Sequence, residues 1–189
     1  MHIKKNMENV QFEKVNFPLW TLLNTTGASS VVEFGAGTFK NFHNVSPDAH
    51  IRVGLESWEP YITDPSFHVP GVTRLHCNVM DFEEVLREVP LECCIIFDFL
   101  EHLSKEDALI LWAKAKKSFS KILLMIPEGV HNQESDVTGM GNHEGQTHRS
   151  TWYLEDVKSL EVDEIIVDSN FHCGADKDTG CIFAVWSKK

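Results

Sequence analysis

The chain has 189 residues, of which 42% are hydrophobic and 24% charged, values typical of a folded globular protein with one ordinary core. Its 17 basic and 28 acidic residues give a formal net charge of −11. Such a charge repels phosphate backbones and anionic membranes, so it argues against a nucleic-acid partner and a membrane surface.

The first 27 residues are predicted to form an N-terminal lead-in to the domain. They contain no apolar core of the kind found in signal peptides, and no window of the chain is long and apolar enough to span a bilayer. A short helix is expected to begin at Phe17 and to stop at Gly27. The five cysteines include no Cys-x-x-Cys pair, so we expect reduced thiols in a cytoplasmic protein. We expect one domain over residues 1–189.

The segment 31–40, VVEFGAGTFK, predicts a buried strand that ends in a tight turn beneath a ligand. Gly35 and Gly37 lack a Cβ atom, so with Ala36 between them they allow a sharp bend and close approach of a ligand. Glu33 can accept hydrogen bonds from cationic or hydroxyl groups of that ligand. A short helix is expected near residues 39–44.

Two further strands are expected at 50–55 and 72–77, each followed by a polar residue. Glu56 after the first can accept both hydroxyls of a ribose, and the alternative is a solvated acid. Asn78 after the second either contacts a ligand or closes a turn. Pro60, Pro65 and Pro70 predict a long irregular connection between these strands, poor ground for a helix. Trp58, in this connection, either stacks on the adenine of a ligand or packs against other side chains of the protein.

The second half continues the alternation of strands and helices. Helices are expected at 81–88, 104–118 and 154–160, and strands at 91–99, 121–126, 162–168 and 181–187. Residues 127–149 form a polar loop, unusually long for a compact domain, which we expect to arch over the site. The last strand can insert antiparallel, because the preceding connection allows a hairpin.

This alternation predicts an α/β fold of the Rossmann-like type. The sheet is expected to be mostly parallel and seven-stranded, with an antiparallel last strand and helices on both faces. Ligands in such sheets bind at the carboxyl ends of the strands. A polar residue follows each of the first four strands in the predicted sheet: Glu33, Glu56, Asn78 and Asp98.

Several motifs in order carry a resemblance to a known family. An acid precedes the glycine turn by two residues, DFLEHL begins at Asp98, and IPEG, Gln133 and HEGQTHRSTW follow. Over about residues 30–168 the chain resembles small class I S-adenosylmethionine-dependent methyltransferases. An NAD fingerprint would instead require a glycine at Lys40. Phe39 stands where the family usually has a third glycine, which we expect to tighten the space near the turn.

The resemblance also implies site residues. It assigns Glu33, Gly35, Ala36, Gly37, Glu56, Asn78 and Asp98 to the cofactor. Some related enzymes, among them small-RNA 2′-O-methyltransferases, bind a divalent metal through an acid-x-x-Glu-His group and a later histidine. Asp98, Glu101, His102 and His148 are the matching candidates here. Because Asp98 has a shorter reach than glutamate, we expect no metal, although it remains the alternative.

The predicted function is therefore S-adenosylmethionine-dependent methylation of a small-molecule acceptor, at a hydroxyl. An oxygen acceptor must lose its proton, and His102 or His148, expected to face one pocket with Glu101, is the predicted catalytic imidazole. His131 and His143 are expected on a solvated loop, with Trp152 anchoring that loop or lining the site. Two alternatives stay open: a binding module without turnover, and an RNA-directed methyltransferase.

Overall fold

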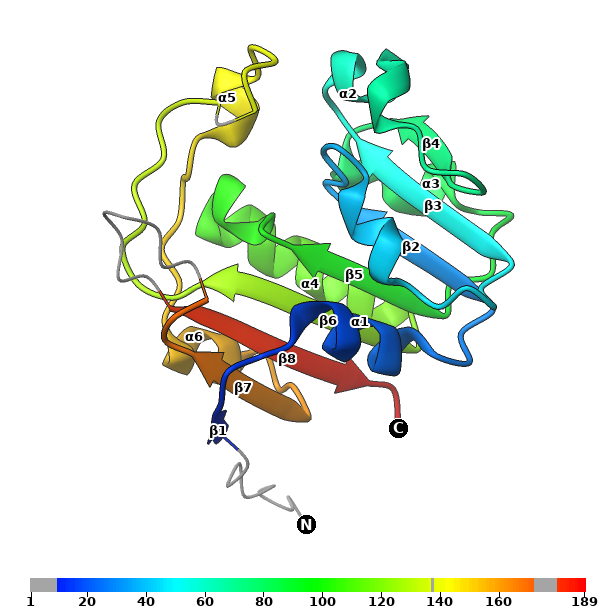
Figure 1. The fold of residues 1–189 in the computed structure, drawn as a ribbon. Helices are drawn as coiled ribbons and strands as arrows, with labels where there is room; N and C mark the ends of the chain where they lie inside the picture. The colour runs from blue at the N-terminus through cyan, green and yellow to red at the C-terminus, as the bar shows by residue number, and fades with distance from the viewer. Residues whose placement is uncertain (1–9, 137, 172–179) are drawn as a thin grey trace.

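The computed structural model describes residues 10–136, 138–171 and 180–189. Its centre is one mixed sheet with the strand order β1-β7-β8-β6-β5-β2-β3-β4 (Figure 1). The bounds of the strands are β1 Val10–Phe12, β2 Ser30–Phe34, β3 Ile51–Glu56, β4 Thr73–His76, β5 Cys93–Phe97, β6 Lys121–Pro127, β7 Glu164–Asp168 and β8 Cys181–Ser187. Strand β8 pairs antiparallel with β6 and β7, and every other pairing is parallel.

The predicted fold class is confirmed, with one strand more than expected. That strand, β1, comes from the lead-in and pairs in parallel with β7, with Val10 opposite Ile165. A three-residue edge strand gives almost no periodic signal, so the polar sequence around it hid the strand. Within the described part of the chain, no helix is long and apolar enough to cross a membrane.

The helices cover both faces of the sheet. Figure 1 shows α1 in front of the sheet and α4 behind it. The bounds of the α-helices are α1 Phe17–Thr25, α2 Glu59–Thr63, α3 Phe82–Val85, α4 Lys105–Ser118, α5 His143–Gln146 and α6 Leu154–Ser159. Short 3₁₀ helices are η1 Lys40–Asn44, η2 Pro65–Phe67, η3 Val79–Asp81 and η4 Leu100–His102.

The core is divided by the sheet into two clusters, because successive strand residues point to opposite faces. Val32 and Phe34 of β2 belong to the cluster under α3, α4 and α6. Val31, which precedes Val32 and points to the other face, belongs to the cluster with Phe42 of η1 and Tyr61 of α2. Both faces of the central strands are therefore apolar, which explains the continuous hydrophobic runs of β2 and β5.

One predicted connection was wrong. The residues after β3 were expected to be irregular, but they contain α2 and η2. Pro60 and Pro65 each lie in the first turn of these helices, where the missing N–H has no intrahelical partner to lose. The prolines therefore start short helices here instead of preventing them. The following helix α3 is shorter than predicted.

Candidate functional site

The glycine turn after β2 forms one wall of a cavity of ≈ 620 Å³. Gly35 has φ +63°, and a Cβ atom there would lie 2.0 Å from the ring of Phe99. Gly37 has φ +51°, and nothing lies within 4 Å of the position of its missing Cβ. One glycine is thus required by packing, and the other leaves open space at the cavity. Gly35, Ala36 and Gly37 all line that cavity, as expected for a turn that admits a ligand.

Phe39 does not narrow this cavity, contrary to the sequence-based expectation. It adopts a left-handed conformation with φ +59° and is fully buried. A Cβ atom on Gly54 of β3 would lie 2.5 Å from the Phe39 ring, so the glycine makes room for it. The side chain therefore points into the core beside the sheet, and the cavity is lined by Thr38 and Lys40 on either side of it.

Two carboxylates assigned to the cofactor, Glu33 and Glu56, are buried and do not line the cavity. Glu33 is fully buried and accepts a 2.6 Å hydrogen bond from Asn41. Burial raises the pKa of Glu33 to about 8, with the nearby charge of Glu56 as a smaller cause. Glu56 accepts hydrogen bonds from the backbone N–H groups of Gly37, Ser57 and Trp58 at 2.8–2.9 Å. Glu56 thereby ties the glycine turn to the end of β3.

The other two residues assigned to the cofactor differ in placement. Asn78 is exposed, and its side chain accepts a hydrogen bond from the Met80 N–H, the turn-closing alternative of the sequence analysis. It does not line the cavity. Asp98 does line the cavity, at the end of β5, with an unusual φ of +45°. Such strained backbone is common at functional sites.

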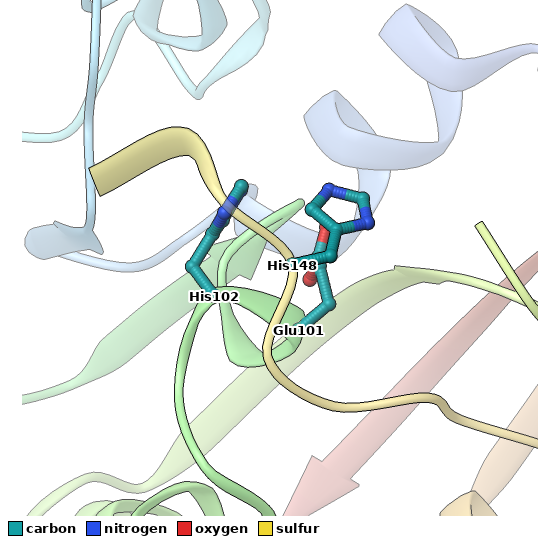
Figure 2. Close-up of side chains that lie close together, drawn as sticks. All are labelled: Glu101, His102 and His148. Carbon is teal, nitrogen blue, oxygen red and sulfur yellow. The ribbon is translucent and has the colours of Figure 1, made fainter. Parts of the chain in front are cut away.

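The turn after Asp98 brings together three of the four candidate metal ligands. Glu101 and His102 lie in η4, and His148 lies at the end of the long loop. One ligand atom from each lies within 4.8 Å of those of the other two. The sequence placed Asp98 in this set, but it is not among the three residues that the structure groups. Figure 2 shows the three side chains on two adjacent segments.

Hydrogen bonds to backbone carbonyls fix the tautomers of both histidines. The Nδ1 atom of His102 lies 3.3 Å from the carbonyl oxygen of Thr147, and Nδ1 of His148 lies 2.6 Å from that of His131. A carbonyl oxygen can only accept, so each Nδ1 carries the proton. Each Nε2 atom therefore keeps a lone pair. This arrangement is typical of histidines that bind a metal or accept a proton.

The electrostatics of this group are those of a buried acid beside a neutral imidazole, that of His102. Glu101 is 3% exposed, and neither carboxylate oxygen has a hydrogen-bond partner among the other described residues. Burial, reinforced by the charge of Asp98, raises the pKa of Glu101 well above its ordinary value. Burial and the neighbouring His148 lower the pKa of His102 to about 4. His102 is therefore neutral near pH 7, ready to donate its lone pair.

The long loop supplies more of the site than expected. His131 was predicted to be solvated, but it is half-buried, lines the cavity and lies 5.2 Å from the His148 ring. His143 is exposed and accepts a hydrogen bond from the Asp136 N–H, in agreement with the solvated-loop prediction. Trp152 is 1% exposed and its backbone pairs with Gly129 across the base of the loop, so it anchors the loop.

Other cavity residues were missed by the sequence analysis. These residues are Lys40, Asn41, Asn44, Tyr61, Thr138 and Gln146. Tyr61 was hidden because its helix, α2, was taken for an irregular connection, yet its hydroxyl lies 2.8 Å from that of Thr138 in the long loop. Polar residues in loops carry no periodicity, so only their positions in space identify them.

Comparison with known proteins gives a consistent picture of the fold. No family model and no curated protein sequence matches the chain. Among solved structures, the N-terminal domain of EvdMO1, crystallised in the presence of SAH and D-fucose, matches with a TM-score of 0.64 and 15% identity, covering 96% of this chain and 91% of that one. The mitomycin 7-O-methyltransferase MmcR matches with a TM-score of 0.57 and 12% identity, covering 91% of this chain and 52% of that one.

An RNA-modifying enzyme is also among the structural matches. Small RNA methyltransferase HEN1 has a TM-score of 0.52 and 13% identity, covering 88% of this chain and 26% of that one. At these identities the comparisons establish the fold and not the acceptor. The chain has the fold of class I S-adenosylmethionine-dependent methyltransferases, as its motifs predicted.

Proposed function

We propose that this protein is an S-adenosylmethionine-dependent methyltransferase that methylates a hydroxyl group of a small molecule. One observation carries the proposal. The glycine turn after β2 and the Glu101, His102 and His148 group open onto the same cavity of ≈ 620 Å³. That volume is within the range of ordinary small-molecule sites. A donor on the turn and an acceptor at the histidines would therefore share one cavity.

The reaction needs little from the protein beyond positioning, because the sulfonium methyl group is already activated. The bond between sulfur and the methyl carbon breaks with its electron pair left on sulfur, and a bond forms between that carbon and the acceptor oxygen. The products are S-adenosylhomocysteine, a methyl ether and the proton of the hydroxyl. The imidazoles of His102 and His148 are placed to orient the hydroxyl and to take its proton.

The same three residues also fit a divalent metal, the alternative that the sequence analysis placed second. Neither buried oxygen of Glu101 has a hydrogen-bond partner among the residues that the structure describes, and Nδ1 of each histidine donates to a backbone carbonyl. We propose that Glu101, His102 and His148 would hold the ion. A bound divalent cation would supply Lewis-acid chemistry that favours loss of the acceptor's proton. Mixed carboxylate and imidazole ligands suit Mn²⁺, Zn²⁺ or Fe²⁺.

An RNA acceptor is the main rival, because the matches include a small RNA methyltransferase. The charge distribution opposes it. The net charge is −11, and among the described residues that line the cavity Lys40 is the only lysine or arginine. Binding to a phosphate backbone depends on several such cations. A binding module without turnover remains the second rival, and it would bind cofactor but transfer no methyl group.

We further propose that residues 1–189 act as one catalytic module in the cytoplasm. Three of the four described cysteines are buried, and all four are free thiols, which suits a reducing compartment. Cys173 lies outside the described residues.

Calorimetry and turnover test the proposal together. We expect S-adenosylhomocysteine to bind in the micromolar range or tighter and NAD not to bind. Incubation of the protein with isotopically methyl-labelled S-adenosylmethionine and a panel of hydroxylated small molecules should yield a labelled methyl ether. Binding without transfer to any acceptor would support the module without turnover, and tight NAD binding would overturn the cofactor assignment.

A further inference from the structure

The part of the cavity beside His148 is built from amide side chains held in a fixed arrangement. The backbone carbonyl of Gln133 accepts a 2.9 Å hydrogen bond from the His148 N–H. The side-chain Nε2 of Gln133 donates to the backbone carbonyl of Gln146 at 2.9 Å and lies 3.3 Å from its side-chain oxygen. Both glutamines line the cavity. The two amides are therefore held next to each other in the cavity that His148 also lines.

The glutamines are also held on a preorganised loop. The carboxylate of Asp136 accepts hydrogen bonds from the backbone N–H groups of Thr138 and Asn142 and from the Thr138 hydroxyl, at 2.6–3.1 Å. Asn142 in turn caps α5, whose last residue is Gln146. An amide pair fixed in this way loses little conformational entropy when it binds a ligand.

The charges of the loop and of the cavity favour an uncharged acceptor over an anionic one. In the loop 127–149 the charged residues other than histidine are four acids, Glu128, Glu134, Asp136 and Glu144, and one base, Arg149. Arg149 donates to the backbone carbonyls of His102 at 2.8 Å and Glu144 at 3.0 Å, so its guanidinium is already engaged. A phosphate or carboxylate placed near Gln133 would thus find one lysine, Lys40, in a cavity that two acids, Asp98 and Glu101, also line.

An uncharged hydroxyl suits the pair instead. A primary amide offers both a donor and an acceptor, and so does a hydroxyl group. If the hydroxyl to be methylated lies at His148, the two amides are placed to contact a second substituent on the same acceptor.

Building on the proposed function, we infer that Gln133 and Gln146 form an acceptor subsite for an uncharged polyhydroxylated molecule of the sugar class. The subsite would bind a hydroxyl next to the one that is methylated. It would discriminate against phosphorylated sugars and against RNA.

The experiment compares matched acceptors. D-glucose, D-fucose and 2-deoxy-D-glucose are incubated with the protein and S-adenosylmethionine beside D-glucose 6-phosphate and a short RNA, and methylated products are measured by mass spectrometry. We expect turnover of an uncharged sugar, with kcat/KM at least about tenfold lower for its phosphate. Preference for the phosphate or for the RNA would overturn the substrate class, and so would no turnover of any uncharged sugar.

Variants then test the two glutamines. Gln133→Ala and Gln146→Ala should each raise KM for the preferred sugar by about tenfold, the effect of removing one neutral hydrogen bond at a polar site. Asn132→Ala is the control, because Asn132 is an exposed amide on the same loop that does not line the cavity. If the glutamine variants behave as this control does, the subsite is refuted.

Binding of S-adenosylhomocysteine to every variant distinguishes a defect in the acceptor subsite from a failure of the proposed methyltransferase function. Unchanged cofactor affinity in Gln133→Ala shows that the fold and the donor site are intact. Failure of the wild-type protein to bind the cofactor would instead refute the proposed function itself.

Discussion

The imidazole rings of His102 and His148 stand edge to face with 4.8 Å between their centroids. The first follows β5 and the second ends the long loop that follows β6. Each ring is fixed through Nδ1 by a carbonyl of the loop that carries His148, Thr147 for one and His131 for the other. The loop therefore sets the orientation of both rings, and moving it would disturb both Nε2 atoms together.

Replacing Glu101 should separate metal affinity from stability. Glu101→Gln removes a buried carboxyl group that has no hydrogen-bond partner in the described part of the chain, so we expect the melting temperature of the metal-free protein to rise. Affinity for Mn²⁺ or Zn²⁺, measured by calorimetry, should fall at least about tenfold. Glu106→Gln, at an exposed position in the first turn of α4, is the control. Equal metal affinity in both variants would remove Glu101 from the metal site.

Arg149 is expected to act as a positioning residue for the same group. Its side chain joins the carbonyl of His102 to that of Glu144, and its backbone N–H donates to the backbone carbonyl of Glu101 at 2.7 Å. Arg149→Met keeps the backbone bond but breaks both side-chain links, so metal affinity should drop about tenfold. Arg149→Lys should recover part of the loss, because one donor remains. Calorimetry that finds wild-type affinity in Arg149→Met would contradict this role.

Glu56 is expected to matter for both the cofactor and the turn. Glu56→Ala leaves the N–H groups of Gly37, Ser57 and Trp58 without their acceptor, and we expect cofactor affinity to weaken by about 1–3 kcal/mol. The free energy of unfolding should fall as well, by a similar amount. Glu59→Ala, an exposed acid on the adjoining helix α2, serves as the comparison. Unchanged calorimetric affinity in Glu56→Ala would take Glu56 out of the cofactor site.

Glu33 should make stability depend on pH. Its pKa is about 8 in the folded protein and near 4.5 in the unfolded chain, so the folded state retains a proton that the unfolded state releases between these values. The contribution of Glu33 to stability is thus greatest below pH 4.5 and declines as pH rises toward 8, by at most about 5 kcal/mol.

Glu33→Gln cannot ionise, yet it can still accept the bond from Asn41. Urea unfolding at pH 5 and pH 8 should show that the variant gains stability relative to the wild type at the higher pH. A constant difference between the two proteins across that range would show that Glu33 ionises normally.

The contact between Phe39 and Gly54 can be tested by a double-mutant cycle. Gly54→Ala places a Cβ atom against the Phe39 ring and should cost about 1–3 kcal/mol of stability. In a Phe39→Gly background, the same change should cost much less, because the ring is gone. Thermal or urea unfolding of the four proteins gives the coupling. Additive effects would mean that the cost of Gly54→Ala does not come from contact with the Phe39 ring.

The sequence alone determined the order of most strands and helices and the place of the glycine turn. Alternation of buried apolar runs with capped helices is a local signal, and Ser104 before α4 shows it, with its side chain accepting from the Asp107 N–H. The motif beginning at Asp98 likewise predicted that His102 and His148 would lie together, which the ring distance of 4.8 Å agrees with. Their chemical role remains a proposal.

Only the tertiary structure decided which polar residues face the cavity. Asn78 and His131 are both polar residues outside helices and strands, yet Asn78 closes a turn while His131 lines the site. Strand β1 was equally hidden, since its pairing partner β7 is far along the chain. The positions of such residues depend on contacts between segments that are distant in the sequence. A residue pattern within one segment does not predict those contacts.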